Sequence, residues 1–490
     1  MWLNIKKIAG QTGDNVALIG DHRTYSYSEL VATVRYVSQQ LGELKHQVLA
    51  LYLDNRPEWV VIDLACQVAG IQLLPLPSFF SSLQLTHAMK EAGASAVVHV
   101  QGDRMSNVFD LQHRFEICGE FTVSTIAFAT AKLPDGTGKI TFTSGSTGEP
   151  KGVCLSNAQQ LSVAISLQSV VDLHSKKHLS MLPFSTLLEN VAGVYLALLS
   201  AGSVLALSQK SMGFNGSSGL NIKTLLGTIT TYQPNSLIVL PELLLALIKS
   251  IENGWQPPFS LEFVAVGGSK VSPALLNRAK QIGLPVYEGY GLSECSSVVS
   301  LNTKENSKAG SVGRPLKHIS VQIDKGEVFV SGNTFLGYVN QPETWGQELI
   351  ATGDLGYLDD KGYLFINGRK KNLLISSFGR NINPEWVESC VLSDGLLKQC
   401  VVFGDAKPFC TALIYPVNRL TSADKIQDCV DLANETLPDY ARIKKWHLLR
   451  NSLTVDSGLL TPNGRPKRHV IQQTYQTQLA MLYDAGLDEL

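Results

Sequence analysis

The feature that most constrains this 490-residue chain is the stretch Ile140–Cys154, Ile-Thr-Phe-Thr-Ser-Gly-Ser-Thr-Gly-Glu-Pro-Lys-Gly-Val-Cys. A short β-favouring run leads into glycines and hydroxyls, which turn tightly and can point backbone N–H groups inward, and Lys151 follows. This combination predicts a polyphosphate cradle, because glycine lets the backbone approach an anion while hydroxyls and lysine add donors and charge. The stretch is not a Walker loop, since Pro150 precedes the lysine and Gly152 follows it.

Length and composition restrict the class of protein. A chain of 490 residues is too long for one core, so we expect at least two domains, and 44 % hydrophobic residues can supply them. A net charge of −1 gives no general attraction to nucleic acid or to an anionic membrane. The eight cysteines form no C-x-x-C pair, so we interpret them as reduced thiols of a cytoplasmic protein. The first residues have no apolar run of signal-peptide length.

Strand and helix patterns alternate along the first hundred residues. Val48–Leu53 and Ile71–Pro75 are typical of buried strands, and residues 24–30 are typical of a strand end that caps a helix. Helical patterns cover 63–70 and 83–93 and, after the cradle, 158–173. This order predicts an α/β fold with a mostly parallel sheet covered by helices. The apolar stretch Val191–Leu207 raises the question of a membrane span, but Ser200 to Ser203 divide it. We therefore expect a buried helix over 190–199 and a buried strand over 204–207.

The order of the cradle residues resembles the phosphate-binding signature of the adenylate-forming, or AMP-binding, superfamily. Within that superfamily the chain is most similar to acyl-CoA synthetases of the long-chain fatty-acid–CoA ligase type, and the resemblance covers essentially the whole chain. It implies a large N-terminal domain of parallel-rich sheets, residues 1–369, joined by a hinge to a small mobile α+β domain, residues 370–490. It also implies ATP, Mg²⁺ and coenzyme A as cofactors, the last as thiol acceptor. No carrier-protein domain is expected to follow.

The resemblance assigns most of the expected site residues. Val286–Glu294 matches a second signature of the superfamily, in which an aromatic ring suits adenine, a hydroxyl the α-phosphate and a carboxylate Mg²⁺. An aspartate in Thr-Gly-Asp accepts hydrogen bonds from ribose hydroxyls, and Gly-Arg-Lys-Lys marks the hinge. The nucleotide-binding residues are then expected to be Thr143, Ser144, Gly145, Ser146, Thr147, Gly148, Gly268, Ser269, Tyr290, Gly291, Ser293, Asp354, Arg369 and Lys371. Thr143 and Glu294 are the expected metal ligands, and Lys151 and Glu294 are expected to take part in catalysis.

The C-terminal tail departs from the family pattern. Relatives place a catalytic lysine here, but counting from Thr461 the position is occupied by Arg465, with Lys467 two residues further on. An arginine is a fixed planar fork, whereas the family uses a flexible point charge. We favour Lys467 as the catalytic residue, because its free rotation can absorb a two-residue shift, and keep Arg465 as the alternative.

The acyl side resembles long-chain enzymes in the segment Leu179–Gly193. Relatives usually carry histidine where Thr186 stands here, which leaves the gating of the pocket open. The segment offers apolar residues and no aspartate for a substrate ammonium, so the sequence favours a medium- or long-chain fatty acid over an amino acid. An aromatic acid stays possible.

The expected function is ATP-dependent formation of an acyl-adenylate, followed by transfer of the acyl group to a thiol. The partners are a small carboxylate and a thiol such as coenzyme A, with a separate acyl carrier protein as alternative acceptor; no nucleic acid and at most peripheral membrane contact are expected. Two rival hypotheses are a nucleotide-binding homologue that has lost catalysis, suggested by Arg465 and Thr186, and a membrane-embedded acyl transporter, suggested by residues 191–207.

Overall fold

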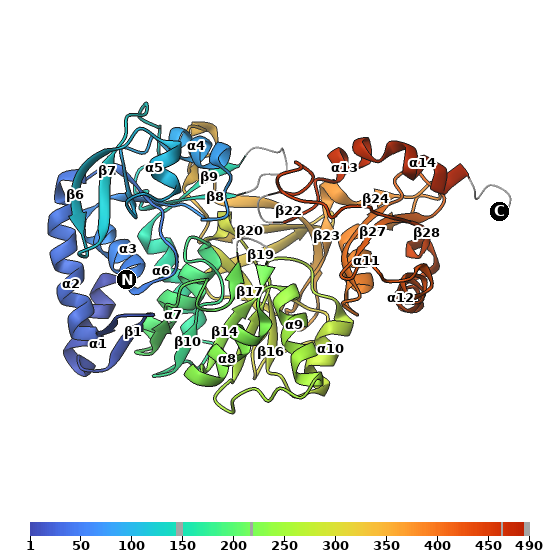
Figure 1. The fold of residues 1–490 in the computed structure, drawn as a ribbon, viewed down its shortest axis with the longest axis horizontal. Helices are drawn as coiled ribbons and strands as arrows, with labels where there is room; N and C mark the ends of the chain where they lie inside the picture. The colour runs from blue at the N-terminus through green and yellow to red at the C-terminus, as the bar shows by residue number, and fades with distance from the viewer. Residues whose placement is uncertain (144–149, 216–218, 462–463, 485–490) are drawn as a thin grey trace.

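The computed structural model describes residues 1–143, 150–215, 219–461 and 464–484. Figure 1 shows a large body made by the first three quarters of the chain and a smaller body, orange to red, made by the last quarter. Within the described residues the large body is built on two sheets of eight and nine strands, and a smaller antiparallel sheet connects it to the C-terminal body.

The eight-stranded sheet carries the strands that flank the expected phosphate cradle. Its core is parallel, with β3 between β4 and β5, while the outer strands pair antiparallel. Side chains alternate between its faces, so Leu49 and Leu51 enter one hydrophobic core and Val48 and Ala50 the other. In sheet order the strands are β21 (Gly337–Tyr338), β9 (Lys151–Leu155), β8 (Lys139–Thr143), β4 (Gln72–Pro75), β3 (Val48–Leu51), β5 (Ala96–His99), β7 (Phe121–Thr125) and β6 (Gln112–Ile117).

The nine-stranded sheet is parallel from β1 to β16, through β11, β10, β14 and β15, and antiparallel at both ends. Apart from β16, its parallel strands are short and mostly buried, as expected for strands covered by helices. In sheet order they are β18 (Arg314–Pro315), β17 (Ser297–Leu301), β16 (Val286–Leu292), β15 (Phe263–Val266), β14 (Ser236–Val239), β10 (Lys177–Leu179), β11 (Ser203–Leu205), β1 (Val16–Ile19) and β2 (Thr24–Ser26).

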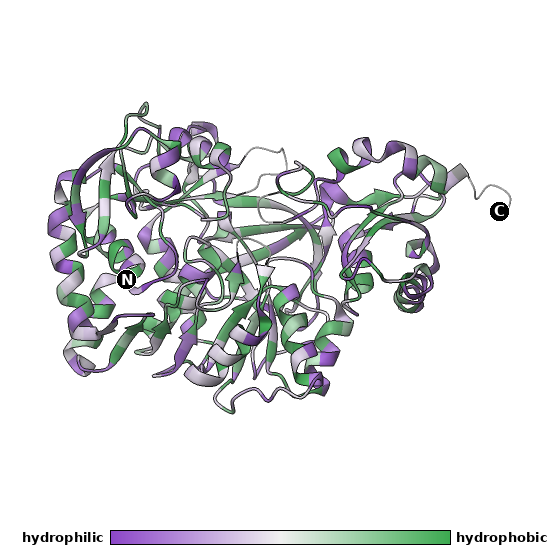
Figure 2. Cartoon of the chain, in the orientation of Figure 1, coloured by the Kyte–Doolittle hydropathy of each residue, from purple (hydrophilic) through white to green (hydrophobic). Residues whose placement is uncertain are grey.

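Helices fill the space between the two sheets and cover their outer faces, and Figure 2 shows the apolar, green residues gathered along the strands that they cover. A capping box between Ser26 and Glu29 fixes the start of the second helix. The inner layer contains α1 (Trp2–Thr12), α2 (Tyr27–Gln40), η1 (Leu41–Leu44), α3 (Pro57–Ala69), α6 (Asn157–Gln168), the π-helical η2 (Glu189–Tyr195) and α7 (Leu196–Leu199). The outer layers contain α4 (Ser82–Glu91) and α5 (Arg104–Val108) on one side, and α8 (Ile222–Tyr232), α9 (Pro241–Glu252) and α10 (Pro273–Gln281) on the other. The short strands β12 (Phe214–Asn215) and β13 (Gly219–Leu220) pair beside α8.

The third sheet of the large body is antiparallel throughout, which differs from the parallel sheets expected from strand and helix alternation. Its four strands are β19 (Ile319–Asp324), β20 (Glu327–Gly332), β22 (Leu349–Leu358) and β23 (Leu364–Arg369). Residues 325–326 join β19 to β20 and residues 359–363 join β22 to β23, and both connections are too short for the crossover that parallel neighbours require; β21 and the 3-10 turn η4 (Pro342–Thr344) lie between β20 and β22. This sheet ends at Arg369, the last residue before the expected hinge.

The C-terminal body has a three-stranded sheet with helices on both faces. Alternate residues of its central strand enter two cores: Ala412 and Ile414 face α11 and α12, while Leu413 and Tyr415 face α13 and α14. Its elements are η5 (Lys370–Asn372), β24 (Leu374–Ile375), β25 (Asn381–Ile382), α11 (Pro384–Leu392), β26 (Leu397–Phe403), β27 (Cys410–Pro416), α12 (Ala423–Glu435), η6 (Asp439–Ala441), β28 (Ile443–Leu448), α13 (Arg468–Thr474) and α14 (Gln476–Asp484). The division of the chain after residue 369 stays a prediction.

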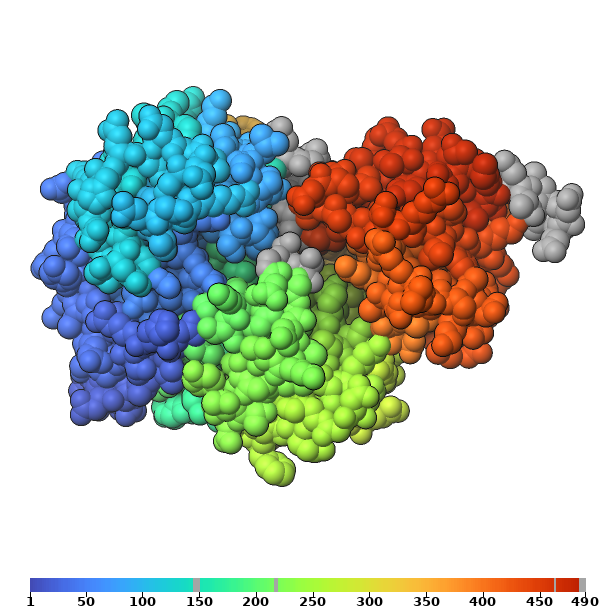
Figure 3. Space-filling model, in the orientation of Figure 1, coloured from blue at the N-terminus to red at the C-terminus, as the bar shows by residue number. Residues whose placement is uncertain are grey.

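Two cationic side chains of the large body hold the smaller body through backbone carbonyls. Lys249 Nζ on α9 donates to the Gly395 carbonyl at 3.0 Å, and Arg278 Nη1 on α10 donates to the Ser393 carbonyl at 2.7 Å. Both carbonyls follow the end of α11, where carbonyls have no intrahelical partner and the helix dipole favours cations. Figure 3 shows the orange C-terminal body lying against the yellow-green region that contains these two helices.

The apolar stretch 191–207 forms buried helical turns, a turn at Ala201 and then β11, as expected. No helix found in the described part of the chain is long and apolar enough to cross a membrane. The helix expected over 158–173 is shorter than predicted, because α6 ends at Gln168 before the β-branched pair Val170 and Val171. All eight cysteines are free thiols, as the sequence predicts.

Candidate active site

The phosphate-cradle stretch connects two adjacent antiparallel strands. Thr143, the last residue of β8, pairs with Lys151, the first residue of β9. The register therefore places the expected metal ligand Thr143 opposite the expected phosphate-binding lysine. Five expected cradle residues, Ser144, Gly145, Ser146, Thr147 and Gly148, lie outside the described residues.

Three side chains meet beside these strands, and we call them the Glu294 cluster: Lys151, Glu294 and Tyr338. The Tyr338 hydroxyl donates to Glu294 Oε1 at 2.8 Å, and Lys151 Nζ lies 5.0 Å from the centre of the Tyr338 ring. Glu294 belongs to the 3-10 turn η3 (Ser293–Cys295), which follows β16 directly. All three side chains are half-buried. The cluster thus presents a carboxylate and an ammonium next to the end of the β8–β9 pair.

The expected signature glycine Gly291 allows this turn to form. A Cβ atom at Gly291 would lie 1.7 Å from the Ser297 carbonyl oxygen, which no neighbour could accommodate because that oxygen is backbone. β16 and β17 can therefore approach closely enough to direct η3, with Ser293 and Glu294, toward the cluster. In this structure Gly291 acts through chain packing.

A second group, the Asp354 cluster, consists of Tyr290, Asp354, Arg369 and Arg465. Asp354 is buried, accepts a hydrogen bond from the Tyr290 hydroxyl at 2.5 Å, and pairs with Arg369 Nε at 2.7 Å. Burial raises the pKa of Asp354, while Arg369 and the Tyr290 hydroxyl oppose that rise. Burial and the Asp354 charge raise the pKa of Tyr290 well above its ordinary value, so the hydroxyl keeps its proton and donates. Asp354 and Arg369 face each other because β22 and β23 are paired in that register.

The tail reaches this cluster through Arg465. Its Nη2 donates to the Gly268 carbonyl at 2.6 Å, across the boundary between the two bodies, and the charges of Arg369, Asp354 and Glu385 act on it. Thr461 fixes the backbone of Arg465, because the Arg465 carbonyl accepts from the Thr461 N–H at 2.7 Å and the Arg465 N–H donates to Thr461 Oγ1 at 3.0 Å. Gly268, with φ of +84°, and Ser269 follow β15.

Lys467 lies at the start of α13, where its backbone N–H donates to the Leu459 carbonyl at 2.9 Å. Among the described residues no hydrogen bond or ion pair of its side chain to the large body is found. The described contacts bring Arg465 to the site, and the assignment of the catalytic tail residue to Lys467 or Arg465 stays a prediction. Lys371, in the expected hinge, is the middle residue of η5, which begins directly after Arg369.

The expected acyl-side segment packs on two buried polar networks. Glu189 is fully buried, with Oε1 2.7 Å from His178 Nε2 and Oε2 accepting from the Leu182 N–H at 3.1 Å. At the next residue, Asn190 accepts from Lys139, which pairs with Asp63 at 2.9 Å. Glu189, the one carboxylate of this segment, is therefore already paired within the protein.

The donor set fits a magnesium ion that is bound together with a polyphosphate. Within the described ranges no group of three or more His, Cys, Asp or Glu side chains could hold a metal by itself. Mg²⁺ commonly uses one or two carboxylates and completes its shell with substrate phosphates and water. Glu294, beside the strand that ends at Thr143, meets that requirement.

Comparison with known proteins decides the family. The model of the AMP-binding enzyme family matches residues 5–339, and that of the AMP-binding enzyme C-terminal domain matches residues 371–486. The chain belongs to the AMP-binding enzyme family. The expected superfamily, the expected fold of a large and a small domain, and the expectation of an enzyme are thereby confirmed.

Relatives of this AMP-binding enzyme include acid–CoA ligases. A 2-succinylbenzoate–CoA ligase of Bacillus pumilus is 27 % identical over 425 residues, which span 80 % of this chain and 82 % of the relative. A long-chain-fatty-acid–CoA ligase of Mycobacterium bovis is 32 % identical over 247 residues, 44 % of this chain and 41 % of the relative. The O-succinylbenzoate coenzyme A synthetase of Bacillus subtilis, solved with ATP and a magnesium ion, has a TM-score of 0.75 at 23 % identity, covering 95 % of this chain and 98 % of that one.

The sequence did not reveal Tyr338. It lies 44 residues from Glu294 along the chain and in another sheet, so no local pattern connects the two. The networks around Lys139 and His178 were missed for the same reason, because their partners come from separate strands and helices.

Proposed function

We propose that this AMP-binding enzyme activates a carboxylic acid with ATP, forming an acyl-adenylate and pyrophosphate, and then transfers the acyl group to coenzyme A. The observation that carries the proposal is that one strand, β16, connects two sites, because it contains Tyr290 and leads directly into the turn with Glu294. The Glu294 cluster offers a carboxylate and an ammonium for a metal-bound polyphosphate, and the Asp354 cluster offers a buried carboxylate for two adjacent ribose hydroxyls. ATP, Mg²⁺ and coenzyme A as reactants agree with what the CoA ligase relatives are named for.

The residues of the chain would neutralise the charge that builds up when a carboxylate attacks a triphosphate. Lys151 would hold the terminal phosphates, and Arg465 would face the α-phosphate from the tail, with Lys467 as the alternative. Mg²⁺ held by Glu294 and Thr143 would supply Lewis-acid stabilisation of the phosphates. After adenylate formation, a turn of the small domain about Lys371 would withdraw the tail residue and admit the thiol.

For the acid we propose a medium- or long-chain fatty acid. The stretch 179–207 contains no Lys, Arg or His, and its one carboxylate, Glu189, is paired with His178. Such a segment offers no cation for a second carboxylate of the substrate and no free anion for an ammonium. Its apolar side chains suit methylene groups instead.

An acid panel tests this proposal. Pyrophosphate release with ATP and Mg²⁺ should be fastest with saturated acids from about eight carbons upward, since each buried methylene contributes about 0.8 kcal/mol. Amino acids and benzoate should be poor substrates. The Glu294→Ala variant is the matched inactive control. Faster turnover of amino acids would overturn the aliphatic assignment, and a parent protein that binds ATP but releases no pyrophosphate with any acid would indicate the inactive homologue.

The second candidate substrate is an aromatic acid, favoured by the names of the 2-succinylbenzoate–CoA ligase relatives. An aromatic acid belongs in the same panel, where its rate of pyrophosphate release would have to exceed the rates of the fatty acids. Coenzyme A is then tested against a phosphopantetheinylated carrier protein as acceptor, with thioester as the product measured. A cytoplasmic location stays a prediction.

A further inference from the structure

The segment Phe335–Val339 ties the two charged members of the Glu294 cluster together. Toward Glu294, the Phe335 N–H donates to the Glu294 carbonyl at 2.7 Å, and the Tyr338 hydroxyl donates to its side chain at 2.8 Å. Toward β9, the Leu336 N–H donates to the Cys154 carbonyl and the Val339 N–H to the Gly152 carbonyl, both at 2.9 Å. One short segment therefore fixes the turn that carries Glu294 to the strand that begins at Lys151.

Tyr338 contacts both charges through different parts of one side chain. Its hydroxyl donates to Oε1 of Glu294, and its ring face lies 5.0 Å from Lys151 Nζ, within the range of a cation–π contact.

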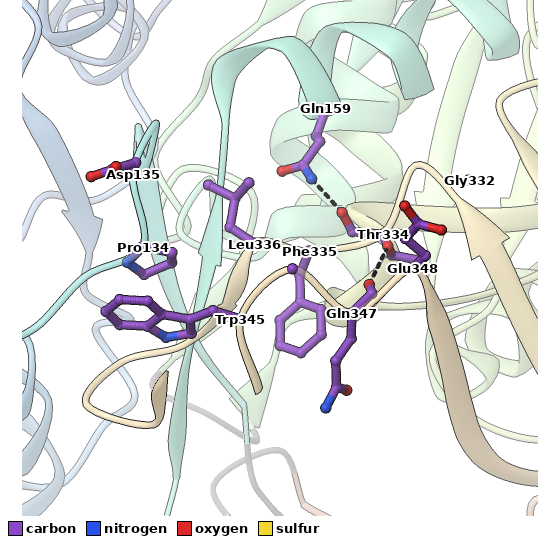
Figure 4. A pocket seen from close by; sticks show the side chains of 11 residues that line it. Pro134, Asp135, Gln159, Gly332, Thr334, Phe335, Leu336, Trp345, Gln347 and Glu348 are labelled. Carbon is purple, nitrogen blue, oxygen red and sulfur yellow. Dashed lines mark hydrogen bonds between the residues drawn. The ribbon is translucent and has the colours of Figure 1, made fainter. Parts of the chain in front are cut away.

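The surroundings hold Tyr338 in a single position. The Tyr338 N–H donates to Thr344 Oγ1 at 3.0 Å, and the Trp345 indole N–H donates to the Tyr338 carbonyl at 2.8 Å. The Phe335 ring packs edge-on against the Tyr338 ring at 4.8 Å. Figure 4 shows Phe335 and Trp345 among the side chains that line a groove of about 480 Å³ beside this segment.

We propose that Tyr338 is a positioning residue for adenylate formation: its hydroxyl fixes one oxygen of Glu294 so that the other is presented to Mg²⁺, and its ring holds Lys151 toward the phosphates. This inference rests on the proposed function. A carboxylate that can rotate loses orientational freedom when a metal binds, and a hydrogen bond present beforehand removes part of that cost. Tyr338 touches neither substrate nor metal in this role.

Tyr338→Phe separates the hydroxyl from the ring. We expect the Mg²⁺ concentration for half-maximal thermal stabilisation by ATP to rise roughly tenfold, the size expected for one lost hydrogen bond to a charged acceptor. Stabilisation by ATP in EDTA should stay unchanged, because the ring and Lys151 remain. The melting temperature without ligand should also stay close to that of the parent. Pyrophosphate release should fall at limiting Mg²⁺ and recover at high Mg²⁺.

Tyr36→Phe is the control variant, since Tyr36 lies exposed on α2, remote in sequence and packing from the cluster. It should leave the Mg²⁺ dependence unchanged. A parent-like Mg²⁺ dependence in Tyr338→Phe would overturn the positioning role. Equal loss of stabilisation with and without Mg²⁺ would also overturn it, because a merely structural tyrosine predicts that result.

A double-mutant cycle completes the test. In a Glu294→Gln background the Tyr338→Phe change should no longer shift the Mg²⁺ dependence, because the charged acceptor is gone. An undiminished shift in that background would contradict the inference. Failure of the proposed function looks different: a parent protein with no Mg²⁺-dependent stabilisation by ATP and no pyrophosphate release overturns both proposals together.

Discussion

The two clusters of the site are prepared for a ligand in different ways. In the Asp354 cluster the carboxylate is buried and already satisfied by the Tyr290 hydroxyl and Arg369, so a ribose must exchange places with a protein partner. In the Glu294 cluster one neutral side chain, Tyr338, contacts both the carboxylate and the lysine, which do not pair with each other. In a cluster whose charges are already paired, a ligand must replace an existing partner, and this requirement gives specificity. In a cluster whose charges are held apart, both charges stay available to the ligand.

The largest effect is expected when the Glu294 carboxylate, which the Glu294 cluster keeps available, is removed. Glu294→Ala should lower the rate of adenylate formation by at least a thousandfold at ordinary Mg²⁺, because loss of the metal ligand removes several kcal/mol of stabilisation of the phosphates. Pyrophosphate release at fixed ATP gives the measurement. A rate within tenfold of the parent would show that Glu294 holds no metal.

The tail provides a second test, because Arg465 of the small domain adds a positive charge to the Asp354 cluster. Arg465→Ala should slow adenylate formation about a hundredfold, the usual order for one donor that stabilises transition-state charge. Thioester formation from supplied acyl-adenylate should change little, because the tail residue acts in the first half-reaction only.

Lys467→Ala is the matched variant from the same segment, and it should retain most of both activities. Each half-reaction is assayed separately with both variants. Greater loss of adenylate formation in Lys467→Ala would instead assign the catalytic role to the lysine.

A change in stability, rather than in rate, is expected for the strand that carries Tyr290. Glu288 is buried two residues earlier in β16, and burial raises its pKa to about 7, opposed by Lys270 and by the Val271 N–H. Its pKa is higher in the folded than in the unfolded chain, so the folded state holds the proton more tightly. Stability should therefore fall as the pH rises from about 4.5 to about 7, by on the order of 3 kcal/mol.

Glu288→Gln should remove that part of the pH dependence. Denaturant unfolding at pH 5 and pH 8 measures the free energy of unfolding. Relative to the parent, the variant should be more stable at pH 8 than at pH 5. An equal pH dependence in both proteins would contradict a buried, neutral Glu288.

Local sequence patterns predicted those parts of the fold that depend on neighbours in the chain. The strand end that caps a helix over 24–30, the buried strand that begins at Val48 and the helix, turn and strand over 191–207 were confirmed, because periodicity and caps specify such elements. The end of α6 was misjudged, since apolar periodicity continued past Gln168 while helix propensity did not.

Contacts between distant segments were not predictable in this way. Tyr338 meets Glu294 only because β21 pairs with β9, and Arg465 meets Gly268 only because the small domain docks beside β15. The resemblance to a family gave the signature residues, but the preference for Lys467 rested on side-chain flexibility alone. The contacts between Thr461 and Arg465, which help to direct the arginine, were not specified by residue types.

The docking of the smaller body through the carbonyls of Ser393 and Gly395 has a consequence for protein engineering. Lys249 and Arg278 recognise backbone atoms, which every sequence supplies, provided that the chain turns there in the same way. A small domain taken from another family member should therefore seat on this large domain without matched side chains at those two positions. Such chimaeras would let the tail be exchanged while the Glu294 cluster and the large-domain part of the Asp354 cluster, Tyr290, Asp354 and Arg369, stay as they are.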